Sequence, residues 1–352
     1  MNISVLNTSL EVVNVIDAYK SMIWTDRYYE VGEFELVTEV SYEILSNIGM
    51  DYILQIGESE HSMLVNKILI KTDSDNGNYL TISGESLESI LKRRILWGLI
   101  SISGNLQNGI KTLINSSIIS PSDEKRKISN FVFEDSTDPA ITGLTIEAQY
   151  TGDNLYDVIQ KICSDKNIGF KVTLSDDLKF VFKLYSGTDR SYNQIANPYV
   201  IFSPKFENLL NSNYIQSVVS MKTISLIGGE GEGSARKYAV TGSDETGLSR
   251  REIFTDARDI SSDVSDGTKL SDSDYTAQLI QRGNEDLAAC VSVSSFEGKV
   301  DTSVMFKYGT DFQNGDIVQI ENEYGQVGAS RVLEVVISQD EDGLSIYPTF
   351  SS

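Results

Sequence analysis

The glycine-rich run GGEGEG (228–233) could do chemistry, because glycine-rich loops can cradle a phosphate group. It lacks the Gly-Lys-Ser/Thr of a P-loop, and its G-x-G is followed by SAR where a dinucleotide-binding loop needs a third glycine. Strand-like sequences flank the run, so no helix N-terminus is present to hold an anion. Its own Glu230 and Glu232 would also repel phosphate. The run therefore predicts a flexible hairpin tip and not a nucleotide site.

Two acid-rich segments could bind a cation. DSDNGN (73–78) has acidic spacing, but an EF-hand loop needs glycine at its sixth position and glutamate at its twelfth. This chain has Asn78 and Gly84 at those positions, so a hairpin turn explains the segment better. DISSDVSDGTKLSDSD (259–274) is rich in side-chain oxygens, and both a weakly bound cation and a solvated loop remain open for it.

Side chains for covalent or acid–base catalysis are scarce. The one histidine, His61, lies in the polar stretch GESEHS, which predicts a solvent-exposed loop position. Two S-x-x-K matches, at 89–92 and 122–125, lack the S-D-N and K-T-G elements that would accompany them, and there is no G-x-S-x-G. Carboxylates are plentiful, but a catalytic pair of them meets only in three dimensions. We therefore expect no enzymatic activity and no cofactor.

The segment SRREIFTDARDI (249–260) is dense in charges of both signs. As a strand, it would alternate its side chains between two faces. One face would carry Arg250, Glu252, Phe254 and Asp256, and the other Arg251, Ile253 and Thr255. Two interpretations are open: an exposed, ion-paired edge, or a contact between subunits, since Arg pairs carboxylates bidentately and is enriched at interfaces.

The composition excludes several classes of protein. The chain has 352 residues, 51 acidic and 29 basic, and a formal net charge of −22. This charge disfavours a nucleic-acid-gripping surface, which would use Lys and Arg to neutralise phosphates. No apolar run is long enough for a membrane span, and the start lacks the regions of a signal peptide. Two distant cysteines, Cys163 and Cys290, fit synthesis in a reducing compartment.

Strands must position most of these residues, because two-residue hydrophobic periodicity dominates the chain. The alternation is clearest in GEFEL (32–36), LKFVFKL (178–184) and SRVLEVVIS (330–338). The second run would place Leu178, Phe180, Phe182 and Leu184 on one face, and the third Leu333, Val335 and Ile337. Asn76-Gly77 and Asp342-Gly343 lie between such runs and predict hairpins, because type I′ turns need positive φ.

Helical periodicity predicts four short helices. Apolar stripes begin at Leu87 and Leu106, and a clearer helix follows Asp153, the residue we predict as its N-cap. A fourth helix is expected over about 273–289, with Ser271 as N-cap.

These elements predict a β-rich α+β protein in three parts. Residues 1–100 are mostly strands and residues 101–195 form a mixed α+β insertion. Residues 196–352 return to strands, with a helical insertion near 260–290. Two β-rich parts around a mixed insertion are typical of barrels or sandwiches.

Five segments follow one another along the chain from Trp24 to Ile260, with a looser match beyond. They are WTDRYYEVGEFELVTEV, LVNKILIKTDSDNGNYLTISGESLESILKRRI, FSPKFENLLNSNYIQS, GEGEGSARK and GLSRREIFTDARDI. This ordered set resembles a known family, the baseplate or tail-tip hub proteins of long-tailed phages of Gram-positive bacteria and related phage-tail-like bacteriocins.

The resemblance implies two β-barrels related to the tail-tube subunit, at 1–100 and 196–352, carrying inserted smaller α+β domains. It also implies a homotrimer, in which six barrels form a pseudo-sixfold ring. The family-like positions, which we interpret as structural and interface residues without a catalytic role, are Trp24, Arg27, Tyr28, Phe34, Arg93, Arg94, Phe202, Asn208, Arg250, Arg251, Glu252, Asp256 and Arg258.

The resemblance further implies a non-enzymatic hub that joins the tail tube to the distal baseplate or tip of a virion tail or tail-like particle. Expected partners are further copies of the chain, a tail tube or distal tail protein, a central spike or tip protein and a tape-measure protein. In a phage, DNA would pass through the lumen, and part of the acidic excess is expected to line it. Two alternatives stay open: a carbohydrate-binding or glycan-cleaving tip protein, and the hub of a DNA-free contractile bacteriocin.

Overall fold

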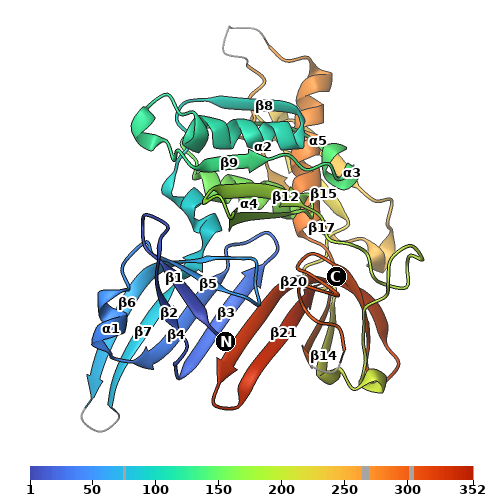
Figure 1. Ribbon diagram of the computed structural model, residues 1–352. Helices are drawn as coiled ribbons and strands as arrows, with labels where there is room; N and C mark the ends of the chain where they lie inside the picture. The colour runs from blue at the N-terminus through green and yellow to red at the C-terminus, as the bar shows by residue number, and fades with distance from the viewer. Residues whose placement is uncertain (74–76, 264–268, 301–304, 352) are drawn as a thin grey trace. The chain divides into compact units, whose positions relative to one another are not determined.

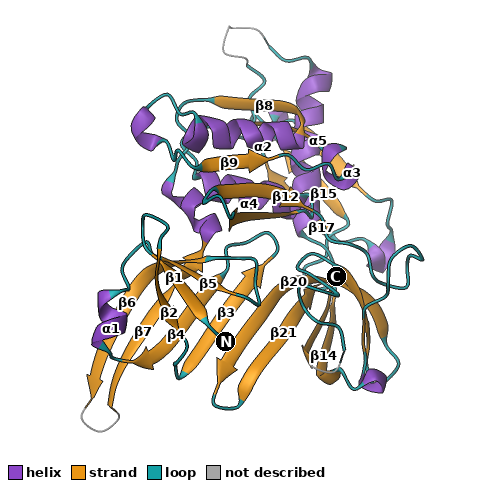
Figure 2. Ribbon diagram, in the orientation of Figure 1, coloured by secondary structure: helices purple, strands orange, loops and turns teal. Residues whose placement is uncertain are grey.

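The computed structural model describes residues 1–73, 77–263, 269–300 and 305–351 (Figures 1 and 2). The chain divides into two compact units. The first comprises Met1–Asn213 and Phe296–Ser352, and the second comprises Tyr214–Ser295. The protein is a β-rich α+β protein, as the hydrophobic periodicity predicts.

One large sheet organises the first unit. Its strands are β1 (Ile3–Leu6), β2 (Val12–Ile16), β3 (Ser21–Arg27), β4 (Glu33–Glu39), β5 (Ile53–Ile56), β6 (Met63–Asp73), β7 (Gly77–Ser86), β13 (Ile201–Phe202), β19 (Ile317–Glu321), β20 (Val327–Asp340) and β21 (Gly343–Ser351). Their order is β13-β19-β20-β3-β4-β7-β6-β5-β1-β2, and β21 pairs with β20 outside this order. All neighbours are antiparallel except β13 and β19.

The N-terminal and C-terminal parts of the chain meet in this sheet. β3 pairs with β20, so that Trp24 lies opposite Ile337, and Figure 1 shows the blue strand β3 beside the red strand β20. All six partner pairs in this pairing are more than 300 residues apart in sequence. The sheet therefore cannot be completed without the C-terminal strands.

Predicted strand patterns are mostly confirmed. On β4, Phe34 and Leu36 are buried and Glu33 and Glu35 are exposed. The hairpin between β20 and β21 turns at Gly343, whose φ is 112°. β6 and β7 also form a hairpin, although Asn76 lies outside the described residues.

Two predicted faces are partly wrong. On β20 a bulge between Val332 and Glu334 shifts the alternation, so Val332 is fully buried in place of Leu333, while Val335 and Ile337 are buried as predicted. An extra residue at a bulge moves the following side chains to the other face. Leu178 lies in a turn with φ 58° and is exposed, so it does not share the buried face of its strand.

The α+β part of the first unit contains the elements between Leu87 and Tyr185. They are η1 (Leu87–Arg93), β8 (Ile100–Asn105), α2 (Leu106–Ile114), η2 (Asn115–Ile119), η3 (Glu124–Arg126), β9 (Phe131–Glu134), α3 (Pro139–Thr142), β10 (Thr145–Tyr150), α4 (Leu155–Asp165), β11 (Gly169–Leu174) and β12 (Phe180–Tyr185). β8 pairs with β10, and β11, β12 and β9 form a second small sheet. The unit also contains α1 (Tyr42–Ser46) and η4 (Pro204–Phe206).

Its helices follow the predicted apolar stripes. The side chains that face one continuous core include Leu87, Ile90, Leu106, Ile110, Leu113, Leu155, Ile159 and Cys163. The N-cap of α4 is Asn154 and not Asp153, because the Asn154 side chain accepts from the Tyr156 N–H at 2.9 Å. Asp153 instead accepts from the Thr151 N–H at 3.0 Å. The cap prediction was therefore wrong by one residue.

The second unit is a three-stranded sheet covered by a helix. Its elements are β15 (Ile224–Gly228), η5 (Gly233–Ala235), β16 (Tyr238–Gly242), η6 (Gly247–Ser249), β17 (Glu252–Asp256) and α5 (Asp272–Ala289), and the strand order is β16-β15-β17. The chain enters along β14 (Leu209–Ser217) and leaves along β18 (Val293–Val300), which pair with each other. α5 begins as predicted at Ser271, whose hydroxyl accepts from the Asp274 N–H at 3.1 Å.

Gly283 lets α5 approach the sheet of the second unit closely. A Cβ at this position would lie 2.6 Å from Cδ1 of Ile227 and 2.9 Å from Cγ2 of Thr241. Gly283→Ala should therefore destabilise the unit by about 1–3 kcal/mol through overpacking, although alanine is the better helix former. Urea unfolding followed by circular dichroism would measure it, with the exposed Gln281→Ala as control. A Gly283→Ala variant as stable as the control would contradict this packing.

Candidate functional site

Five of the predicted interface residues have buried side chains, namely Trp24, Tyr28, Phe34, Phe202 and Asn208. Trp24 and Phe34 pack against each other across β3 and β4, with ring centroids 5.9 Å apart. Phe202 packs against Phe312 and Phe350. The Asn208 side chain accepts from the Ser203 N–H at 2.9 Å and donates to the Ile201 carbonyl at 2.8 Å. These side chains stabilise the first unit from within.

Tyr28 joins three parts of the first unit. Its hydroxyl donates to the Asn167 carbonyl at 3.2 Å, and its N–H donates to the Leu333 carbonyl at 2.9 Å. The Arg331 guanidinium lies 5.4 Å from the centre of its ring. A Cβ at Gly169 or Gly315 would lie 2.4 or 2.2 Å from Cε2 of this ring. The ring therefore fills a space that only two glycines leave open.

The predicted arginines of the first unit make local contacts. Arg27 pairs with Glu33 at 2.7 Å and Glu334 at 2.6 Å. Arg93 pairs with Asp51 at 2.5 Å. Arg94 donates through Nε and Nη2 to the Arg126 carbonyl, at 3.1 and 2.9 Å. Arg27 thus ties β3 to β20, whereas Arg93 and Arg94 lie at the end of η1.

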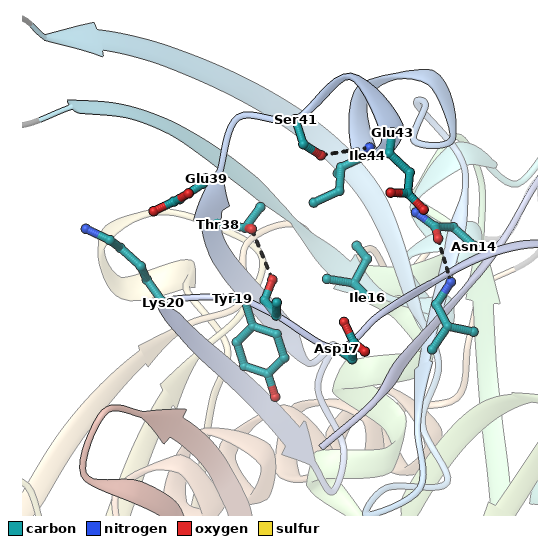
Figure 3. Close-up of a pocket in the computed structure, with 12 residues that line it drawn as sticks. Asn14, Ile16, Asp17, Tyr19, Lys20, Thr38, Glu39, Ser41, Glu43 and Ile44 are labelled. Atoms are coloured by element: carbon teal, nitrogen blue, oxygen red, sulfur yellow. Dashed lines mark hydrogen bonds between the residues drawn. The ribbon is translucent and has the colours of Figure 1, made fainter.

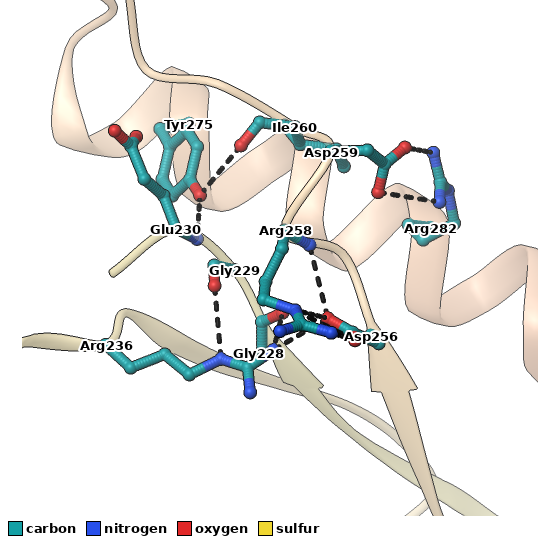
Figure 4. Close-up of polar contacts among 10 residues, drawn as sticks. All are labelled: Gly228, Gly229, Glu230, Arg236, Asp256, Arg258, Asp259, Ile260, Tyr275 and Arg282. Atoms are coloured by element: carbon teal, nitrogen blue, oxygen red, sulfur yellow. Dashed lines mark hydrogen bonds and ion pairs between the residues drawn. The ribbon is translucent and has the colours of Figure 1, made fainter. Parts of the chain in front are cut away.

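The predicted residues of the second unit form ion pairs along β17. Arg250 pairs with Glu252 at 2.6 Å. Asp256 pairs with Arg258 at 2.6 Å and with Arg236 at 2.7 Å (Figure 4). The hydrogen bond from Arg258 is the main cause that lowers the pKa of Asp256.

The alternation predicted for β17 is confirmed. Its exposed residues are Glu252, Phe254 and Asp256. Thr255 is buried, and its hydroxyl donates to an Asp286 carboxylate oxygen at 2.7 Å and accepts from the Ser225 hydroxyl at 2.8 Å. The Arg251 N–H donates to Thr223 Oγ1 at 2.8 Å.

GGEGEG forms a hairpin tip between β15 and β16, as predicted. Arg236 donates to the Gly228 and Gly229 carbonyls at 2.8 and 3.1 Å, and the Glu230 N–H donates to the Tyr275 hydroxyl at 2.7 Å (Figure 4). Side chains of the protein itself thus hydrogen-bond to backbone carbonyl and N–H groups of this tip.

A buried ionic cluster in the first unit was not predicted. His61 is 3% exposed, and its Nδ1 lies 3.3 Å from Oε1 of Glu88, which is 1% exposed. Asp26, fully buried, accepts from Ser59 Oγ at 2.7 Å and from the Tyr308 hydroxyl at 2.8 Å. The prediction of a solvent-exposed histidine was therefore wrong, because partners from distant segments enclose the loop.

The charges of this cluster shift one another's pKa values. Burial would lower the pKa of His61, but Asp26 and Glu88 outweigh it and raise that pKa to about 9. Burial raises the pKa of Asp26, and nearby His61 only partly offsets this. Burial would also raise the pKa of Glu88, but the His61 cation lowers it overall. A protonated His61 therefore pairs with an ionised Glu88 at neutral pH.

The raised pKa of His61 predicts lower stability at alkaline pH. Because the folded state holds the proton more tightly than the unfolded state, this contribution is complete below pH 6.5 and disappears as the pH rises through about 9. Thermal unfolding should show a falling midpoint between pH 7 and pH 10, and His61→Gln should flatten that fall. Equal pH profiles for both proteins would contradict the assignment.

A groove of about 450 Å³ lies beside the edge strand β2 (Figure 3). Its lining includes Asp17, Lys20, Glu39 and Glu43. The groove is a surface feature of the sheet edge.

The described residues bear on metal binding and on membrane spans, and on the predicted cation loop only in part. Within residues 1–73, 77–263, 269–300 and 305–351, no group of three or more His, Cys, Asp or Glu is placed to hold a metal ion. The predicted cation loop at 259–274 falls partly outside those residues, since 264–268 are not among them. In the same described part, no helix is long and apolar enough to cross a membrane.

Solved structures of tail proteins share this fold. A tail protein from Neisseria meningitidis MC58 superposes with a TM-score of 0.61 at 13% identity, covering 99% of this chain and 96% of that chain. The 43 kDa tail protein of prophage MuSo2 from Shewanella oneidensis gives 0.63 at 13% identity, covering 99% and 98%. Prophage tail protein gp18 from Listeria monocytogenes EGD-e gives 0.58 at 12% identity, covering 100% and 94%.

The family of the chain follows from its sequence. No curated protein matches this sequence significantly. The family model described as Siphovirus ReqiPepy6 Gp37-like protein matches residues 2–350. The resemblance to phage tail proteins is thus confirmed, and the chain belongs to the Siphovirus ReqiPepy6 Gp37-like protein family.

Proposed function

We propose that this chain is a structural tail protein that acts as a non-enzymatic hub between the tail tube and the distal baseplate or tip. The observation that carries the proposal is the family match over residues 2–350. The shared fold with three tail proteins, over nearly the whole chain, supports it.

The hub would be a homotrimer, in which each chain supplies two tube-like barrels to a pseudo-sixfold ring. In this proposal residues 1–100 and 196–352 contribute the two barrels, and residues 101–195 and the helix near 260–290 are insertions. The extended antiparallel sheet of the first unit supports a tube-like origin. The β3–β20 pairing would hold the two barrels of a chain in a fixed register.

Nine of the thirteen predicted interface residues would divide between two roles. Residues with buried side chains, namely Trp24, Tyr28, Phe34, Phe202 and Asn208, would shape the fold. Exposed charges of the second unit, namely Arg250, Glu252, Asp256 and Arg258, are available for contacts between subunits. Because exposed ion pairs contribute little to stability, their loss should affect assembly more than folding.

Other subunits and tail proteins are the proposed partners. They are a tail tube or distal tail protein, a central spike or tip protein and a tape-measure protein. With a net charge of −22, an acidic lumen would let DNA pass without binding. A neutral or basic lumen in the assembled ring would contradict that part of the proposal.

Light scattering combined with averaged electron micrographs tests the ring. We expect a mass of three chains of 39.0 kDa each and a ring with sixfold appearance. A chain that stays monomeric even with its tail tube protein present would contradict the trimer. Release of reducing sugar from cell walls by the purified chain would instead favour a glycan-cleaving tip protein.

A further inference from the structure

Cations and exposed apolar side chains gather where η1 leads into β8. Arg126 Nη2 donates to the Ile95 carbonyl at 2.6 Å, and the Arg126 guanidinium lies 4.2 Å from the centre of the Trp97 ring. The Arg126 carbonyl in turn accepts from Arg94. These contacts and neighbouring positions define the arginine–tryptophan patch, which consists of Arg94, Ile95, Trp97, Leu99, Lys125 and Arg126.

The cations of this patch lack carboxylate partners. In the described part of the chain, the side chains of Arg94, Lys125 and Arg126 form no salt bridge, whereas the adjacent Arg93 pairs with Asp51. Burial lowers the pKa of Arg94, and the positive charges of Arg126 and Arg93 lower it further. Positive charges crowd here in a chain whose net charge is −22. An anionic group would relieve this repulsion.

Apolar side chains accompany these charges. Ile95 is 48%, Trp97 51% and Leu99 66% exposed. Leu96 between them is buried, so the segment is anchored while its neighbours face water. Three exposed apolar side chains within five residues mark an interaction site more often than a single exposed side chain does.

We propose that the arginine–tryptophan patch binds an acidic, partly apolar segment of another protein. Carboxylates of the segment would pair with Arg94 and Lys125, and its apolar side chains would cover Ile95, Trp97 and Leu99. A phosphate polymer fits less well, because it would leave the aliphatic side chains in water and would be repelled by the chain's overall charge. This inference does not depend on the hub assignment.

Tryptophan fluorescence of the purified chain tests the proposal. Trp97 would report binding, since the only other tryptophan, Trp24, is fully buried. A synthetic peptide of glutamate and leucine should shift the emission to shorter wavelength in a saturable manner. Lys125→Gln and Leu99→Ser should each weaken binding by about tenfold, equivalent to 1.4 kcal/mol. Lys161→Gln, an exposed lysine on α4, should leave it unchanged.

Several outcomes would overturn the proposal. They are no emission shift with the glutamate–leucine peptide, equal binding of a lysine–leucine peptide, and equal binding of inorganic polyphosphate. An unchanged affinity in Leu99→Ser would show that only charge is recognised. In assembled particles, a photo-crosslinking residue in place of Leu99 should capture an acidic peptide of another protein. Capture of a second copy of this chain, or of no protein, would contradict the proposed partner.

Discussion

Glu88→Ala should destabilise the first unit by about 3–5 kcal/mol, the cost of leaving a buried charge without its partner. Glu88 is 1% exposed and lies 3.3 Å from His61. Its Oε1 also accepts from the Val172 N–H at 2.8 Å, which fastens β11 to η1. The substitution therefore leaves the His61 cation and the Val172 N–H without their carboxylate partner in the core. Chemical denaturation followed by far-UV circular dichroism would measure the loss.

Two further variants serve as controls for Glu88→Ala. Glu85→Ala removes a nearby carboxylate that is one-third exposed and pairs with Lys92, so it should cost about 0–1 kcal/mol. His61→Gln together with Glu88→Gln removes both charges and should be less harmful than Glu88→Ala alone. A loss below about 1 kcal/mol for Glu88→Ala would contradict a buried, paired carboxylate.

Tyr28→Ala should also cost about 3–5 kcal/mol, because it removes a large ring from a fully packed site. The ring is 1% exposed and lies against Gly169, Gly315 and Arg331. These neighbours come from β11, the loop before β19, and β20, so the cavity would open where the α+β part meets the main sheet. Unfolding monitored by tryptophan fluorescence would detect the loss, because the fully buried Trp24 becomes exposed.

Tyr28→Phe is the matched control. It keeps the ring and removes only the hydrogen bond to the Asn167 carbonyl at 3.2 Å, so it should cost about 1 kcal/mol. If Tyr28→Ala lowered the free energy of unfolding no more than Tyr28→Phe, packing of the ring would not hold the α+β part against the main sheet as its contacts indicate.

Local features of the fold could be predicted from the sequence, because neighbouring residues determine them. The alternation on β4, the Asp342-Gly343 turn and the Ser271 cap of α5 are all confirmed. Each depends on side-chain spacing or on a short hydrogen bond. The bulge at Val332 could not be predicted in this way, because it depends on how β20 pairs with β21 and not on the spacing of residues within β20 alone.

Long-range features could not be predicted, because they depend on contacts between segments that are distant in sequence. The cluster of Asp26, His61 and Glu88 forms from three segments that meet only in the folded chain. One signal was present: Asp26 follows Met22 and Trp24 at two-residue spacing, so an acid occupies a strand face that is otherwise apolar. A carboxylate in that position needs a buried partner, and the only histidine of the chain was a candidate for it.

The copy number of this chain in purified tail particles tests the central claim most directly. Quantitative mass spectrometry with isotope-labelled standard peptides would count it against the tail tube protein. A trimeric hub at one end of the tail predicts three copies per particle. A count that rises with tail length, as for a tube subunit, or the absence of the chain from particles would contradict the proposed hub.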